Sequence, residues 1–83
     1  MKSKSTPDER FLMQLYQTAL ALGDPFSEIS YPEIAASLGI KEIALKSIIR
    51  DLAQANFLKK VGDRTVQLTE RGFAVARATI ENR

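Results

Sequence analysis

Hydrophobic residues recur at spacings of three and four along the first quarter of the chain, which is the pattern of a helix with one buried face. This stripe consists of Phe11, Leu12, Leu15, Ala19 and Leu22. Before it, Thr6 can cap a helix, Pro7 suits a first helical turn, and Glu9 can close a capping box. The pattern therefore predicts a first helix over about residues 7–22.

A second, shorter stripe precedes a glycine and predicts a helix of two turns. Its apolar positions are Ile34, Ala35 and Leu38. Gly39 can take the left-handed conformation that ends a helix, and Ser30 can form a capping box with Glu33 at the start. Ile29 ends the preceding loop, where a very short strand fits.

The third stripe predicts a longer helix, from about residue 42 to residue 55. The inner face of this helix carries Leu45, Ile48, Ile49 and Leu52, and its outer face carries Lys46, Ser47 and Arg50. Asn56 can end the helix, because asparagine tolerates the left-handed conformation.

The pattern then changes to two short extended runs, over residues 58–61 and 65–68. They flank Gly62-Asp63-Arg64 and predict a tight β-hairpin, whose loop has two or four residues by the pattern alone. We expect Lys59 and Lys60 to keep the strand edge from pairing with other chains.

Thr69 is placed to cap a final helix that runs to about Glu81. The expected inner face of this helix is Phe73, Ala76 and Ile80, and Phe57 is expected in the core as well. The predicted fold class is mainly α with a small β-hairpin (α+β), in the order α-β-α-α-β-β-α.

Length and composition indicate one folded domain, because 83 residues with 45% hydrophobic and 27% charged side chains suit a single small core. We expect residues 1–6 to be a disordered tail and residues 7–83 to form the domain. No run approaches the ~20 apolar residues of a membrane span, and Met1 to Lys4 lead into no apolar signal segment. We therefore expect a cytoplasmic protein without membrane contact.

The chain contains no cysteine and no histidine. Disulfide bonds and Cys/His zinc sites are thereby excluded, and enzymes lose their commonest general base and nucleophile. No pair of carboxylates and no Ser/Lys arrangement stands out from ordinary surface residues. We expect no catalysis, no cofactor and no metal.

Positive charge is concentrated in the second half of the chain. Residues 1–40 carry three Lys or Arg against five Asp or Glu, a net charge of −2, whereas residues 41–77 carry eight against four, a net charge of +4. A small protein with a polyanionic partner shows this asymmetry, and so does one with an ordinary solvated surface.

The segment from Pro32 to Ile48 has the residue types of a helix-turn-helix. This motif needs a small residue where the helices cross and a glycine at the turn, and Ala35 and Gly39 meet these needs. Apolar anchors on both sides are Ile34, Leu38, Ile40, Leu45 and Ile48.

With this motif the chain resembles the winged helix-turn-helix family, in the broad sense that includes MarR-like, ArsR-like and PadR-like regulators, over roughly residues 7–81. Two further features carry the resemblance. One is the exit Leu52-Ala53-Gln54-Ala55-Asn56-Phe57-Leu58. The other is Leu68-Thr69-Glu70-Arg71-Gly72, which looks like the Leu-Thr-Glu-x-Gly that such domains often place between wing and final helix.

The resemblance implies that the third helix lies in the major groove of double-stranded DNA and that a short wing, over residues 58–68, touches the backbone. The exposed positions of the matching recognition helix are Lys41, Glu42, Ile43, Lys46, Ser47 and Arg50, and Arg64 matches the wing tip. The cations suit guanine edges or phosphates, Ser47 suits either, and Ile43 suits a thymine methyl. The chain departs from the family at Lys41, where members usually have a Ser or Thr cap, and in the shortness of its wing.

The function that follows is DNA binding, sequence-dependent or general, as a small transcriptional regulator that acts as a homodimer. The alternative is a winged-helix module that docks onto a partner protein and binds no DNA, which the exposed Ile43 and the missing cap also suit. Tyr31 could stack on a ligand, but packing beside Pro32 is the expected role.

Overall fold

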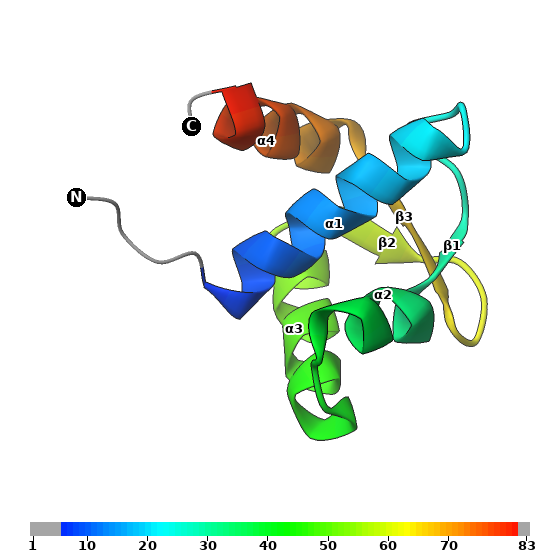
Figure 1. Cartoon of the computed structure of the whole chain (residues 1–83), viewed down its shortest axis with the longest axis vertical. Helices are drawn as coiled ribbons and strands as arrows, with labels where there is room; N and C mark the ends of the chain where they lie inside the picture. The colour runs from blue at the N-terminus through cyan, green and yellow to red at the C-terminus, as the bar shows by residue number, and fades with distance from the viewer. Residues whose placement is uncertain (1–5, 82–83) are drawn as a thin grey trace.

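The computed structural model describes residues 6–81, and this part of the chain forms four helices around a three-stranded antiparallel sheet (Figure 1). In chain order the elements are α1 (Pro7–Ala21), β1 (Ile29–Ser30), α2 (Tyr31–Leu38), α3 (Glu42–Gln54), β2 (Leu58–Lys60), β3 (Thr65–Leu68) and α4 (Glu70–Glu81). The class is α+β, and the order of elements is the one that the sequence predicts.

The predicted tail falls mostly on residues 1–5, which lie outside the described residues. Thr6 is described, and its side chain accepts a hydrogen bond from the backbone N–H of Glu9 at 3.1 Å. The carboxylate of Glu9 in turn accepts from the backbone N–H of Thr6 at 3.3 Å, which confirms the capping box. Among residues 6–81, no helix has the length and apolar character needed to cross a membrane.

Helix α1 crosses the middle of the molecule and packs against α2, α3 and α4 (Figure 1). Four of its predicted core residues are buried, but Leu22 is 62% exposed, so that part of the prediction is wrong. Leu22 lies one residue beyond the helix, where the chain turns at Gly23. Tyr16, which was not among the predicted core residues, is 9% exposed and belongs to the core.

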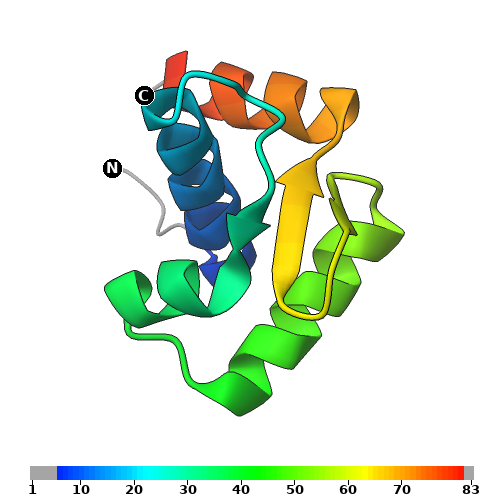
Figure 2. The same cartoon turned by 90° about the vertical axis from the view of Figure 1, so that its right-hand side faces the viewer.

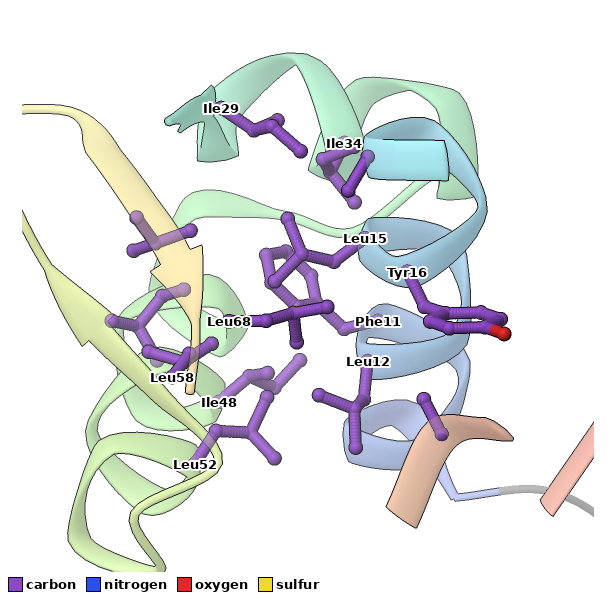
Figure 3. Close-up of a cluster of buried hydrophobic side chains, with 14 of the residues drawn as sticks. Phe11, Leu12, Leu15, Tyr16, Ile29, Ile34, Ile48, Leu52, Leu58 and Leu68 are labelled. Carbon is purple, nitrogen blue, oxygen red and sulfur yellow. The ribbon is translucent and has the colours of Figure 1, made fainter. Parts of the chain in front are cut away.

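The core lies between α1, α3 and one face of the sheet (Figure 3). The largest fully buried side chains are Phe11, Leu15, Leu58 and Val66. All four predicted inner residues of α3 are buried, while Phe57, Phe73 and Ile80 pack against the core as partly buried side chains. Asn56 has φ of 66° and ends the α3 region in the left-handed conformation, as predicted.

The strand order is β1-β3-β2, so β3 is the central strand. The backbone N–H of Val61 donates to the carbonyl oxygen of Thr65 at 2.9 Å, which leaves three residues, Gly62, Asp63 and Arg64, in the hairpin loop. The sequence allowed a loop of two or four residues, and the observed length lies between them.

The start of α2 differs from the prediction. Ser30 precedes the helix, but its side chain makes no capping hydrogen bond, so the predicted capping box with Glu33 is wrong. Ser30 belongs to β1, where it pairs with Thr65. The next backbone N–H, of Tyr31, donates to the carbonyl oxygen of Arg64 at 3.0 Å, so strand pairing rather than a side-chain cap holds this helix start.

Helix α4 begins in direct contact with the chain that leaves α3. The hydroxyl of Thr69 accepts from the backbone N–H of Gly72 at 3.0 Å and donates to the carbonyl oxygen of Asn56. A Cβ atom on Gly72 would overlap the backbone carbonyl of Phe57. The glycine in Leu68-Thr69-Glu70-Arg71-Gly72 is therefore required by close backbone packing.

Candidate nucleic-acid interface

The outward side of α3 is a stripe of residues at helical spacings, opposite the buried side of the same helix. The stripe consists of Ile43, Lys46, Ser47 and Arg50. Positions three, four and seven apart share one face of a helix, so these side chains point the same way. Ile43, Lys46 and Arg50 are exposed and Ser47 is half-buried. We call these four residues the α3 stripe.

Within the α3 stripe, Arg50 is only loosely held. Its Nη2 donates to the hydroxyl of Ser47 at 3.5 Å, and its Nε lies 3.7 Å from a carboxylate oxygen of Asp51. The side chains of Arg50 and Asp51 are 67% and 49% exposed, and an ion pair in water contributes at most about 1 kcal/mol. The guanidinium therefore remains available to another anion.

Lys41 occupies the N-cap position of α3, and its side chain makes no capping hydrogen bond. Lysine has no acceptor atom, so it cannot satisfy a free backbone N–H at the helix start. Glu42 follows in the first turn, where a carboxylate suits the helix dipole. This start of α3 is exposed at both residues.

The tip of the β2–β3 hairpin is fastened to neighbouring elements. The hydroxyl of Tyr31 donates to the carbonyl oxygen of Asp63 at 3.1 Å, beside the backbone bond from Tyr31 to Arg64. On the other side, the hydroxyl of Thr65 donates to the carboxylate of Glu28 at 2.7 Å and accepts from the backbone N–H of Gly62 at 2.9 Å. The exposed side chain of Arg64 thus extends from a fixed backbone.

A cleft of about 390 Å³ lies between α2, the first half of α3 and the hairpin tip. Figure 2 shows the closed end of the hairpin beside these two helices. Small and apolar side chains form part of its lining: Pro32, Ala35, Ala36, Ile40 and Leu45. Tyr31 contributes an aromatic ring to the lining. We expected this residue to pack beside Pro32, and Pro32 lines the same cleft.

The charged part of the lining joins residues from two separate segments. Lys46 of α3 and Arg64 of the hairpin loop both line the cleft, together with Glu42 and Asp63. The cleft thus contains two cations and two carboxylates. Of the predicted site residues, the structure brings these two cations to one cleft, while Lys41, Ile43, Ser47 and Arg50 lie outside its lining along α3.

Lys60 is a cation near this cleft that we did not predict as a site residue. It pairs with Val66 across the ladder, so its side chain starts on the face of the sheet that covers the core. Its Nζ lies 5.9 Å from the centroid of the Tyr31 ring. Lys59 pairs with Gln67 and points to the opposite face. Side chains alternate between the two faces of a strand, so counting from the buried Leu58 could have assigned Lys59 and Lys60 to opposite faces.

Negative charge follows the exposed cations in the C-terminal half of α3. Asp51 follows Arg50, and Asp8 of α1 lies close enough to interact with it. The pKa of Asp8 is raised, first because burial disfavours its charged form and second because Asp51 repels it. Negative charge therefore accumulates beyond Arg50, on the side of α3 that faces α1.

Within residues 6–81, no three His, Cys, Asp or Glu side chains are grouped so that they could hold a metal ion. Comparisons of the chain with protein-family models, with curated proteins and with solved structures give no match in any of the three. The chemistry of this surface therefore rests on its own residues: cations on α3 and at the hairpin tip, an apolar residue on the α3 stripe, and an amphipathic cleft between them.

Proposed function

We propose that this chain is a winged helix-turn-helix domain that binds double-stranded DNA, with α3 in the major groove and the β2–β3 hairpin on the adjacent backbone. One observation carries the proposal. Lys46 of α3 and Arg64 of the hairpin loop line a common cleft, and Arg50 continues the exposed positive charge one turn further along α3. Phosphate contacts made from two elements would fix the orientation of the protein on the duplex.

The local geometry of α2 and α3 supports the helix-turn-helix part of the proposal. Gly39 ends α2 with φ of 71°, in the left-handed conformation that such a turn uses. Ala35 is 3% exposed, so a small side chain lies buried on α2. The hairpin follows α3 directly, in the position that a wing would occupy.

A single domain of this kind binds DNA weakly, so homodimerisation is part of the proposal. If one copy neutralises about four phosphates, log K falls with log salt at a slope of only about −3.6. Two copies on neighbouring half-sites would double this slope, with recognition helices about 34 Å apart. We propose the role of a small transcriptional regulator that needs no metal and no cofactor.

Fluorescence anisotropy with a labelled duplex of mixed sequence tests the proposal. We expect binding at about 50 mM salt that weakens steeply as salt is added. The double variant Lys46→Ala/Arg50→Ala should bind at least tenfold more weakly and lose about two units of the salt slope. Absence of wild-type binding at low salt would reject the proposed function.

The matched control is Lys59→Ala/Arg77→Ala, which also removes two cations. Lys59 points to the opposite face of the sheet from Lys60, and Arg77 lies on α4, paired with Glu81 at 2.9 Å. This variant should keep most of the wild-type affinity. Equal losses in both double variants would mean that net charge, and not the α3 surface, determines binding.

A second candidate function is docking onto a partner protein, which the 87% exposed Ile43 favours. The charge-balanced cleft beside α3 also suits a protein partner. Salt separates the two functions, because an apolar protein interface keeps its affinity when salt is raised, whereas contacts with phosphates do not.

A further inference from the structure

Ile43 is the most exposed of the large hydrophobic side chains on the described surface. It is 87% exposed, against 62% for Leu22 and 48% for Val61. On the α3 stripe its neighbours are Lys46 and Ser47, which are charged and polar, so this face of the helix does not extend the core. At this exposure the side chain contributes little to the core, so packing does not account for an aliphatic residue here.

The side chain of Ile43 also cannot serve the electrostatic part of DNA binding. It has no donor for a phosphate and no donor or acceptor for a base edge. In the major groove the one apolar group that a base presents is the C5 methyl of thymine. An aliphatic residue on a groove-facing helix therefore discriminates by contact with that methyl or not at all.

The position of Ile43 on α3 suits such a contact. It is the second residue of the helix and shares the α3 stripe with Arg50, two turns away. Seven residues of α-helix span about 10 Å. Successive base pairs are about 3.4 Å apart, so Ile43 and Arg50 are far enough apart to face different base pairs.

We propose that Ile43 is a specificity-determining residue that packs against a thymine methyl and gives this protein a preference for thymine-containing sites. The inference rests on the proposed DNA binding and adds the base that is read. Ile43 provides apolar discrimination, while Lys46 and Arg50 provide the attraction to the backbone. Removal of one buried methyl contact corresponds to about a fourfold loss of affinity.

The experiment compares two duplexes that differ only in the thymine methyl: alternating dA-dT and alternating dA-dU. Both have the same charge and the same Watson–Crick pairs. Wild-type protein should bind the dA-dT duplex about fourfold more tightly, measured by anisotropy at low salt. Ile43→Ala removes most of the aliphatic side chain and should reduce this ratio. Ile43 is exposed, so the variant is expected to fold, which circular dichroism checks.

The control is Leu22→Ala, which removes another exposed aliphatic side chain, at the end of α1 and outside the proposed interface, and should keep the fourfold ratio. Equal wild-type affinity for both duplexes would overturn the inference, as would an unchanged ratio in Ile43→Ala. Binding to the mixed duplex but to neither alternating duplex would also overturn it. Absence of binding to all three duplexes would instead reject the proposed function, so the two failures are distinguishable.

Discussion

The hydroxyl of Tyr31 donates a hydrogen bond to the carbonyl oxygen of Asp63 at 3.1 Å, and this bond joins the first residue of α2 to the hairpin loop. Tyr31 thus fixes the position of the loop relative to α2. Its ring lines the cleft that Lys46 and Arg64 share, with Lys60 above the ring. Tyr31 thus shares one cleft with Lys46 and Arg64 and lies beside Lys60, whereas Lys41 and Arg50 lie outside this cleft.

Replacement of Tyr31 by Phe should loosen the hairpin loop while keeping the ring in place. The loss of one hydrogen bond predicts a decrease of about 1 kcal/mol in the free energy of unfolding. DNA affinity should fall by more than this stability change explains, because the loop that carries Arg64 loses one of the hydrogen bonds that hold it. Urea denaturation and anisotropy measure the two effects. Tyr16→Phe on α1 is the control, and equal affinity losses in both variants would contradict the role of Tyr31.

Lys59 and Lys60 should contribute unequally to DNA binding, although they are adjacent and carry the same charge. Lys60 starts on the face of the sheet that meets the helices, and Lys59 starts on the other face. Lys60→Ala should reduce the salt slope by about one unit, and Lys59→Ala should leave it nearly unchanged. Identical slopes for the two variants, measured by anisotropy over a range of salt, would argue against this placement of the interface.

Gly72→Ala should destabilise the protein, although alanine is the better helix former. At an unhindered helix position this change gains up to about 1 kcal/mol. Here a Cβ atom would overlap the backbone carbonyl of Phe57, so α4 would have to move away from the chain that leaves α3. We expect the free energy of unfolding to fall by about 1–3 kcal/mol, as for other overpacked sites. A stabilised variant in urea denaturation would show that the contact is absent.

The pKa of Asp8 should depend on the charge of Asp51. The pKa of Asp8 is raised above its ordinary value of 3.8, with burial as the larger cause and Asp51 as the smaller. A raised pKa means that the charged carboxylate destabilises the fold. This cost is present above the folded-state pKa and disappears as the pH falls below the ordinary value.

Nuclear magnetic resonance titration of the carboxyl groups measures this pKa directly. In Asp51→Asn, the pKa of Asp8 should move down but stay above 3.8, because burial remains. The variant should also lose part of the pH dependence of stability in the acidic range. A pKa of Asp8 that does not respond to the change at residue 51 would mean that the two carboxylates do not interact.

Local patterns were sufficient for much of the fold. The periodicity of α3 predicted its four buried residues, because each of them lies within a single regular helix. The same periodicity failed at Leu22, since the helix ends at Ala21 and periodicity has no meaning beyond that point. Asn56 was predictable because its conformational preference is its own and depends little on distant residues.

Features set by strand pairing could not be predicted in the same way. Ser30 has the residue type of a cap, yet its partner in the structure is Thr65 of β3, far along the chain. The three-residue hairpin loop depends on the same ladder. For the candidate interface, the α3 stripe followed from helical spacing, whereas the contribution of Lys60 depended on the register of β2 against β3.

The hydrogen bonds that Thr65 makes to Glu28 and Gly62 act on the same loop as those of Tyr31. With both its sides fastened in the free protein, this loop has little conformational freedom left to surrender when it meets another molecule. The entropy cost of ordering a binding loop, about 0.5–1.5 kcal/mol for each flexible side chain, is then confined largely to Arg64. The proposed contact of this short hairpin with DNA would therefore require little further ordering of its backbone.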